Sequence, residues 1–188
     1  MNERIACVGS RETSTVVLKW MEATGAKLVR AGYTIVSGNA PGADQAWARG
    51  GNSMDATRVE LCLPWDSFES SAVHGRNTVQ IYAPRDGERY VRLVQATHPN
   101  FGRLTDAAIR LHARNAMIVE GAHLVLGSLN PDKPNGGGSR SAFRIAQRQG
   151  ICTFNVADAF VRKMIDDRLA DGLDPRGKVY VVGTGKRW

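Results

Sequence analysis

Short apolar segments alternate with longer amphipathic segments along the first third of the chain. The predicted elements are strands at 4–8, 33–36 and 58–63 and helices at 15–31 and 43–49. Gly32 ends the first helix as a C-cap residue would. This β-α-β-α-β order predicts a parallel sheet with helices on its faces.

The rest of the chain begins irregularly and then returns to the same alternation. Residues 66–103 are polar and turn-rich and are predicted to be an insertion, with a short apolar stretch at 79–83 and a helix at 88–96. The later predicted elements are helices at 104–120, 139–149 and 157–169 and strands at 123–127, 151–156 and 178–182. We therefore expect a Rossmann-like, doubly wound, mainly parallel α/β sheet with helices on both faces over residues 1–156. Residues 157–188 should form a helix-and-strand extension packed on the same domain.

Composition limits the class of protein. A chain of 188 residues that is 43% hydrophobic suits one α/β domain. No apolar run is long enough to span a membrane, and residues 1–4 lack the apolar segment of a secretion signal, so we expect a cytoplasmic protein. The net charge of +7 favours phosphate-bearing partners, although a basic protein without a nucleic-acid role would have the same balance.

The cysteines and histidines do not indicate a metal site. Cys7, Cys62 and Cys152 each lie in a short apolar run, which predicts buried free thiols in a reducing compartment. The four histidines have no partner at metal-ligand spacing, and His123, at the start of a strand, is predicted to be structural. We therefore expect neither a metal nor a cofactor.

Three glycine-containing loops follow predicted strands or open predicted helices. They lie at 9–11, 37–44 and 136–141, and the carboxyl ends of parallel strands meet at one edge of a sheet, where ligands bind. Glycine lets the backbone approach a phosphate, and the first N–H groups of a following helix face an anion. The alternative is that these glycines only make tight turns and helix caps. The candidate phosphate-binding residues are Gly9, Ser10, Arg11, Ser37, Gly38, Gly42, Asp44, Arg114, Asn115, Gly136, Gly137, Gly138, Ser139 and Arg140.

Three of these positions have a second interpretation. Asp44 opens a predicted helix, where its carboxylate could cap the helix or bond a ribose hydroxyl. Arg114 and Asn115 lie on a predicted helix. They could belong to a solvated face of that helix, or they could form a second contact to a phosphate or a base. His112, two residues before Arg114, should point elsewhere. The G-x-G-x-x-G fingerprint and the full P-loop are both absent, and 183–186 (GTGK) is predicted to be a basic tail.

Four motifs resemble those of one protein family. The segment 34–44 (TIVSGNAPGAD) resembles the second-strand loop of the DprA/Smf-like DNA-processing proteins. Segment 8–11 (VGSR) resembles their first-strand motif, 114–118 (RNAMI) their Arg-Asn-x-x-Ile element, and 136–139 (GGGS) the glycine-rich loop. These proteins belong to the SLOG superfamily, with the LOG-type phosphoribohydrolases and the molybdenum-cofactor carrier proteins. The resemblance covers residues 4–156, while 65–103 matches no element of the family.

The resemblance implies that the chain binds a nucleotide, a nucleotide-derived ligand or single-stranded DNA. It implies ligand-binding roles for Ser10, Arg11, Ser37, Gly38, Asp44, Arg114, Gly137, Gly138 and Ser139, and also a homodimer. LOG-type hydrolases carry a glutamate shortly after the glycine-rich loop, where this chain has Ser139 followed by RSAF and then Arg144. Cleavage of an N-glycosidic bond needs a carboxylate, so its absence favours binding.

Three functions therefore remain open. The leading hypothesis is a binding protein that holds phosphate on glycine-rich loops. One alternative is a hydrolase or transferase acting on the N-glycosidic bond of a nucleotide, for which Asp44 is a weak catalytic candidate. The other is sequestration of a signalling nucleotide.

Overall fold

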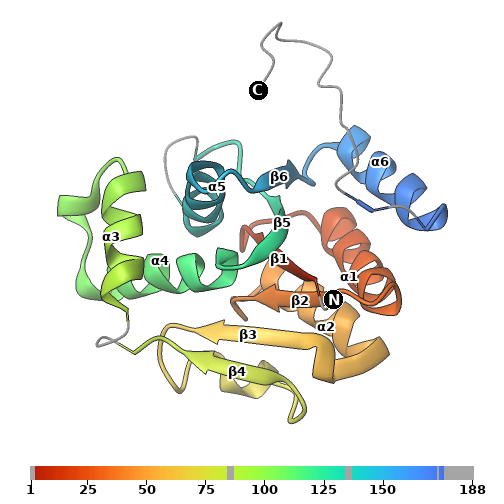
Figure 1. Cartoon of the computed structure of the whole chain (residues 1–188), viewed down its shortest axis with the longest axis horizontal. Coiled ribbons are helices and arrows are strands. Elements are labelled where there is room, and N and C mark those ends of the chain that lie inside the picture. The colour runs from red at the N-terminus through yellow and green to blue at the C-terminus, as the bar shows by residue number, and fades with distance from the viewer. Residues whose placement is uncertain (1–2, 84–86, 134–136, 173, 176–188) are drawn as a thin grey trace, which may run out of the picture.

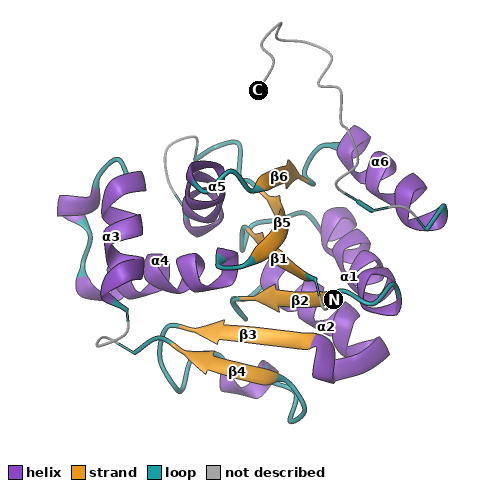
Figure 2. Cartoon of the chain, in the orientation of Figure 1, coloured by secondary structure: helices purple, strands orange, loops and turns teal. Residues whose placement is uncertain are grey.

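The computed structural model describes residues 3–83, 87–133, 137–172 and 174–175. Its strands form one sheet in the order β4-β3-β2-β1-β5-β6, and every pair of neighbours is parallel (Figures 1 and 2). The strands are β1 (Arg4–Gly9), β2 (Thr34–Ser37), β3 (Val59–Leu63), β4 (Thr78–Ile81), β5 (Ala122–Ser128) and β6 (Cys152–Asn155). The predicted Rossmann-like, doubly wound α/β fold is confirmed.

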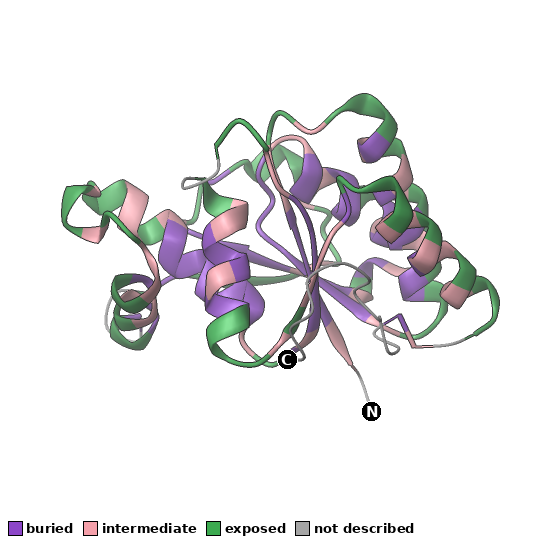
Figure 3. Ribbon diagram, turned by 90° about the horizontal axis from the view of Figure 1, so that it is seen from above, coloured by how far each residue is buried: buried purple, intermediate pink, exposed green. Residues whose placement is uncertain are grey.

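Helices cover both faces of this sheet (Figures 1 and 3). They are α1 (Thr15–Arg30), α2 (Ala43–Asp55), α3 (Glu88–Thr97), α4 (Asp106–Val119), α5 (Gly138–Arg148) and α6 (Ala159–Ala170). Side chains alternate between the two faces of a strand, so Ile5 and Cys7 of β1 pack with α1, α2 and α6. Ala6 and Val8 pack with α3, α4 and α5 on the opposite face. A strand covered on both faces needs apolar residues at every position, which explains the continuous apolar run of β1.

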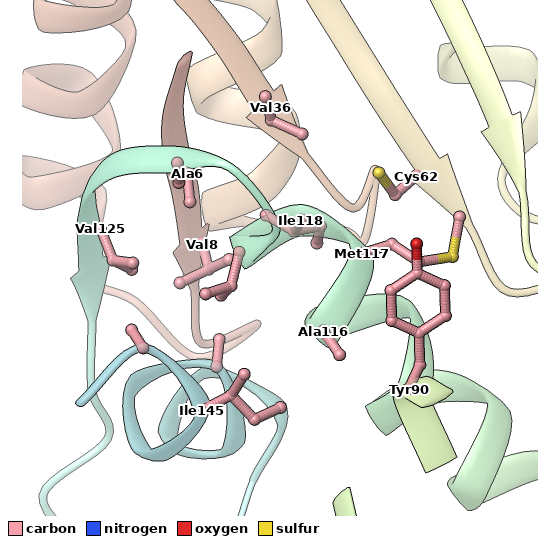
Figure 4. Close-up of a cluster of buried hydrophobic side chains, with 14 of the residues drawn as sticks. Ala6, Val8, Val36, Cys62, Tyr90, Ala116, Met117, Ile118, Val125 and Ile145 are labelled. Atoms are coloured by element: carbon pink, nitrogen blue, oxygen red, sulfur yellow. The ribbon is translucent and has the colours of Figure 1, made fainter. Parts of the chain in front are cut away.

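The layer of α3, α4 and α5 is held by a core that fixes the position of α4. Ala6, Val8, Val36, Cys62 and Val125 of the strands meet Ala116, Met117 and Ile118 of α4 and Ile145 of α5 (Figure 4). Full burial of one such aliphatic side chain stabilises a fold by roughly 1.5–3 kcal/mol. Because the last two turns of α4 are anchored in this way, its earlier turns stand at the carboxyl edge of the sheet.

The segment 66–103 contributes to both the sheet and the core. The apolar stretch predicted at 79–83 supplies β4, which extends the sheet by pairing with β3, with Leu61 opposite Val79. α3 supplies Tyr90 and Val94 to the core, and Phe68 packs with residues of β3. A four-residue strand gains its stability from a distant partner, so its local sequence gives little sign of the pairing.

The prediction of buried cysteine thiols holds for two of the three cysteines. Cys7 and Cys62 are buried free thiols, as predicted, and burial raises the pKa of Cys62 to about 12. Cys152 is exposed, so the prediction of burial is wrong there: it opens β6, which has a neighbouring strand on one side only. The strand predicted at 178–182, the 183–186 segment and Gly136 lie outside the described residues.

The C-terminal helix α6 packs on the face of the sheet that carries α1. Trp20 Nε1 donates a hydrogen bond of 2.7 Å to Asp166 Oδ2, and Lys27 Nζ lies 2.7 Å from Asp166 Oδ1. Ile165 is fully buried against the same layer. Within the described part of the chain, no helix has the length and apolar character required to cross a membrane.

Candidate functional site

A cavity of about 420 Å³ opens at the carboxyl edge of the sheet. It lies where β1 is flanked by β2 on one side and β5 on the other, so that the loops leaving β1 and β5 diverge. This topological switch point is where ligands bind in open α/β sheets. The lining comes from the β1 and β2 loops, from α4, and from the loop and helix after β5. Its residues are Val8, Gly9, Ser10, Arg11, Glu12, Ala40, Asp44, Ala108, Leu111, His112, Arg114, Asn115, Leu129, Asn130, Lys133, Gly137, Gly138, Ser139 and Arg140.

One face of α4 forms a wall of the cavity. Ala108, Leu111, His112 and Asn115 recur at intervals of three and four residues, which places them on one side of a helix. The expectation that His112 points away from a site containing Arg114 is wrong. His112 belongs to the face that borders the cavity, while Arg114 contributes from the neighbouring face through its long side chain.

A buried ion pair lies at the floor of the cavity. Asp44 and Arg114, with 5% and 4% of their surfaces exposed, approach within 3.4 Å through Asp44 Oδ2 and Arg114 Nη1. Asp44 Oδ1 also accepts the Gly9 N–H at 3.1 Å, and Oδ2 accepts the Ala40 N–H at 3.4 Å. Burial raises the pKa of Asp44, although Arg114 and the two backbone donors oppose the shift. Asp44 thus joins the β1 loop, the β2 loop and α4.

Arg114 is incompletely bonded for a buried cation. Its Nε is buried without a partner, and its one described hydrogen bond, to Asp44, is long. Its Cζ lies 5.6 Å from the centre of the Phe68 ring, so the segment after β3 covers the guanidinium. Burial lowers the pKa of Arg114 and the Asp44 carboxylate opposes that shift. An anion in the cavity could supply the acceptors that Arg114 lacks.

Gly38 makes room for this arginine. A Cβ at position 38 would lie 1.3 Å from Arg114 Nη1 and 2.7 Å from Asp44 Oδ2. Any side chain at position 38 therefore displaces the guanidinium. The glycine acts through Arg114, since Gly38 itself does not line the cavity.

The remaining predicted residues of the β2 loop, Ser37 and Gly42, lie close to other parts of the protein backbone. Ser37 is buried, and its hydroxyl donates to Cys7 O at 2.7 Å and to Asp44 O at 3.3 Å. Gly42 precedes α2, and a Cβ there would lie 2.9 Å from Arg11 O. Ser37 and Gly42 do not line the cavity, so the β2 loop contributes Ala40 and Asp44 to it.

The glycine-rich loop reaches the cavity at the start of α5. Gly137 has a φ of +91°, a conformation that favours glycine, and directly precedes the helix. Asn115 Nδ2 donates to Gly138 O at 3.0 Å, which ties the loop to α4. The first N–H groups of a helix have no acceptor within the helix, and its dipole favours an anion there. This end of α5 therefore suits a phosphate.

The cations at the mouth of the cavity differ in their bonding. Arg140 donates to the carbonyl oxygens of Lys133 and Asn130, at 3.2 and 3.4 Å. Lys133 Nζ lies 2.8 Å from Glu12 Oε1, which lowers the pKa of Glu12. Arg11 is exposed and its guanidinium has no hydrogen bond or ion pair with any described residue. Arg11 is thus available to a ligand without breaking an existing contact.

His112 is a buried polar group at the edge of the cavity. It is 9% exposed, its Nδ1 is buried without a partner, and its ring centre lies 4.7 Å from that of His98. Burial lowers the pKa of His112 to about 4, helped by the charges of His98, Arg114 and Arg144. The imidazole is therefore neutral at pH 7.

The cavity brings together Gly9, Ser10, Arg11, Asp44, Arg114, Asn115, Gly137, Gly138, Ser139 and Arg140 of the predicted set. Sequence reasoning missed Glu12, His112, Asn130 and Lys133. Glu12, Asn130 and Lys133 follow β1 and β5, so the rule that selected Gly9 could have selected them too. For His112 the available signal was the spacing of four residues from Ala108 and three from Asn115.

Comparisons with known proteins find a family model that matches part of the chain and solved structures that share its fold. Residues 1–59 match the family model of DNA recombination-mediator protein A. DNA processing protein A from Helicobacter pylori, described as having a unique mode of binding single-stranded DNA, has 16% sequence identity and a TM-score of 0.58. That alignment covers 81% of this chain and 64% of that one. DNA processing protein A from Streptococcus pneumoniae has 17% identity and a TM-score of 0.56, with coverage of 82% and 50%.

A third structure and the curated proteins complete the comparison. TM1055 has 16% identity and a TM-score of 0.53, with 89% of this chain and 85% of that chain covered. Curated protein sequences gave no match. Identities this low show a shared fold, and the chain spans about two thirds and one half of the two DNA processing proteins. The predicted resemblance to the DprA/Smf-like proteins is confirmed, by the family model over residues 1–59 and by the fold over most of the chain.

Proposed function

We propose that the chain binds single-stranded DNA and holds a phosphate group of the strand in the cavity at the carboxyl edge of the sheet. The observation that carries this proposal is Arg114, a buried guanidinium beside the cavity with an unpartnered Nε and one hydrogen bond of 3.4 Å. A buried charge without sufficient partners is costly, and a phosphate oxygen would offset that cost. The fold likeness to the Helicobacter pylori protein, described as binding single-stranded DNA, supports the choice of ligand.

Two further features suit a phosphodiester. Arg11 stands exposed at the mouth, with no described partner, and could pair with a phosphate bidentately. The start of α5 presents backbone N–H groups beside Gly138 and Ser139. The net charge of +7 raises the local concentration of a polyanion more than that of a single nucleotide. We therefore favour a strand over a free nucleotide, which would occupy the same place as one residue of the strand.

The bonding of Asp44 favours binding over N-glycosidic cleavage. Both of its carboxylate oxygens already accept hydrogen bonds from Gly9, Ala40 and Arg114. A carboxylate that activates water or stabilises a ribosyl cation needs an oxygen free to face the substrate. Asp44 is better placed to orient Arg114 than to act on a ligand.

The test is binding of an internally labelled oligothymidylate of 20 nucleotides, followed by fluorescence anisotropy over a range of salt. We expect the affinity to fall as salt rises, because neutralised phosphates release counterions. Arg11→Ala should weaken binding and make the salt dependence shallower, by about one unit in its slope. Arg30→Ala is the matched control, since Arg30 is an exposed arginine in the last turn of α1 and does not line the cavity.

Three results would count against the proposal. Equal losses in the two variants would mean that binding reflects only net charge. Absence of binding at low salt would exclude the strand as ligand. Thermal stabilisation by thymidine or adenosine monophosphate, together with no effect of the oligonucleotide, would favour the small nucleotide instead.

A further inference from the structure

The cavity has two chemically different walls. Above the Asp44–Arg114 pair at the floor, Ala108, Leu111 and His112 of α4 make one wall that carries no charge at neutral pH. The other wall is cationic: Arg11 and Lys133 lie on the loops that follow β1 and β5, and Arg140 lies in the first turn of α5. Glu12, which pairs with Lys133, offsets one of these three charges. A nucleotide has the same division, with a charged phosphate at one end and a neutral, flat base at the other. A phosphate held by Arg114, the cationic wall and the start of α5 would leave the base to face Ala108, Leu111 and His112.

His112 is a hydrogen-bonding group that the neutral wall can offer to a base. Ala108 and Leu111 have no polar side-chain atoms, and Asn115, on the same helix face, is tied to the glycine-rich loop because its Nδ2 donates to Gly138 O. The Nδ1 of His112 is buried, so Nε2 is the ring nitrogen that a molecule in the cavity can reach. His112 is more than nine-tenths buried and neither ring nitrogen has a described hydrogen bond. Such a polar side chain in a cavity wall is typical of a ligand contact.

We propose that His112 contacts the nucleobase of the residue bound in the cavity and sets the preference of the site among bases. This inference rests on the proposed function, because it assumes that the ligand is a nucleic-acid strand. Contacts to phosphate position a strand without reading it, whereas contacts to base edges discriminate between sequences. A neutral imidazole suits the second role, because the arginines compete more strongly for the phosphate.

The experiment compares affinities for oligo-dT, oligo-dC and oligo-dA of 20 nucleotides in the wild type and in His112→Phe. Phenylalanine keeps a flat ring and removes the hydrogen bond. We expect the wild type to rank the three strands and the variant to reduce the largest Kd ratio by about threefold to tenfold, the worth of one hydrogen bond. The melting temperature should not fall, because the substitution also removes a buried nitrogen that has no partner.

The other variants make each outcome decisive. His98→Phe is the matched control: His98 contacts the His112 ring but does not line the cavity, so the ranking should persist. Arg11→Ala should weaken binding to all three strands alike. If His112→Phe does not fold, His112→Gln decides instead, since glutamine presents a different set of hydrogen-bonding atoms and should change the ranking.

Either of two results would overturn the inference. The first is a wild type that binds the three strands without preference. The second is a set of His112 variants that lose affinity for all three equally or leave the ranking unchanged. A wild type that binds no strand would instead overturn the proposed function itself, so the two failures are distinguishable.

Discussion

The two edges of the sheet carry similar polar residues but bond them differently. At the amino edge, Arg4 of β1 donates to Glu120 O and to Glu60 Oε2, both at 2.9 Å. At the carboxyl edge, Arg114 is more deeply buried, yet its hydrogen bond to Asp44 measures 3.4 Å. Both arginines have a buried Nε without a partner. The difference lies in the other nitrogens, which are well satisfied in Arg4 and poorly satisfied in Arg114.

The histidines of the two edges show the same contrast. His123, at the start of β5, has its Nε2 3.1 Å from Asp174 Oδ2 and 3.4 Å from Glu3 Oε2. His112 has no such carboxylate among the described residues, and its Nδ1 is buried and unpartnered. Apart from Arg4 Nε, these two residues of the amino edge therefore have their polar contacts completed within the chain. The carboxyl edge leaves them incomplete around a cavity, where a ligand can complete them.

The largest expected effect comes from removing one carboxylate at each edge. Asp44→Ala leaves Arg114 buried without a counter-charge and should lower the free energy of unfolding by about 3–5 kcal/mol. Glu60→Ala leaves the partly exposed Arg4 solvated and should cost about 1 kcal/mol or less. Urea unfolding measures both. The double variant Asp44→Ala/Arg114→Leu should be more stable than Asp44→Ala. Equal losses of unfolding free energy in Asp44→Ala and Glu60→Ala would contradict the proposed difference between the two edges.

The pH dependence of the free energy of unfolding should distinguish His112 from an exposed histidine, His74. The pKa of His112 is lowered to about 4 in the folded protein, against an ordinary value of 6.5, so protons bind the unfolded chain more readily. The contribution of neutral His112 to the free energy of unfolding is therefore complete above pH 6.5. It is lost as the pH falls towards 4, and the loss is about 3 kcal/mol at most. His112→Phe should remove this part of the loss in unfolding experiments from pH 7 to pH 4. His74→Phe, at an exposed site outside the cavity, should keep it.

Oligonucleotide binding should distinguish the arginines at the two edges, Arg114 and Arg4. Arg114→Leu removes the guanidinium beside the cavity and should weaken oligonucleotide binding by about tenfold or more, as for a lost hydrogen bond to a charged group. Arg4→Leu, at the opposite edge, should leave the Kd unchanged. Fluorescence anisotropy on folded samples of both variants measures this difference. A similar loss for Arg4→Leu would place the ligand elsewhere.

The smallest expected effect concerns the mouth of the cavity. Glu12 pairs with Lys133 and also accepts from Asn130, so its carboxylate holds groups that a phosphate could otherwise use. Glu12→Gln should therefore strengthen strand binding at low salt. The gain should be only about twofold to threefold, because exposed ion pairs are weak and are screened by salt. Glu22→Gln is the control: Glu22 forms an exposed pair with Arg49 outside this cavity. Equal changes in the two variants would reduce the effect to net charge.

Much of the fold could be predicted from local patterns. The strong alternation of apolar runs and amphipathic segments gave the order of the strands and helices, apart from β4. β4 was missed as a strand because Val79 and Ile81 are exposed and the strand is defined by its pairing with β3. The apolar run around Cys152 would look the same in an edge strand as in a central one, so it does not indicate that Cys152 is exposed.

The site could be predicted in part. Placing ligand groups after strands selected Gly9, Ser10, Arg11 and the start of α5, because parallel strands bring their carboxyl ends together. The same rule gave no orientation for individual side chains. Ser37 turns into the protein to bond Cys7 O, whereas His112, expected to point away, borders the cavity.

The sequence by itself determined the alternation of elements, the glycines at strand ends and the basic charge, because each depends on residues close together in the chain. Only the tertiary structure decided which of these groups meet. Asp44 and Arg114 are 70 positions apart, and they meet because the packing of α2 and α4 on opposite faces of the sheet brings both side chains to one edge. The space for that contact depends on a third residue, Gly38, because a side chain there would overlap the Arg114 guanidinium. Such a contact depends on sheet register and helix packing together, and no local pattern contains both.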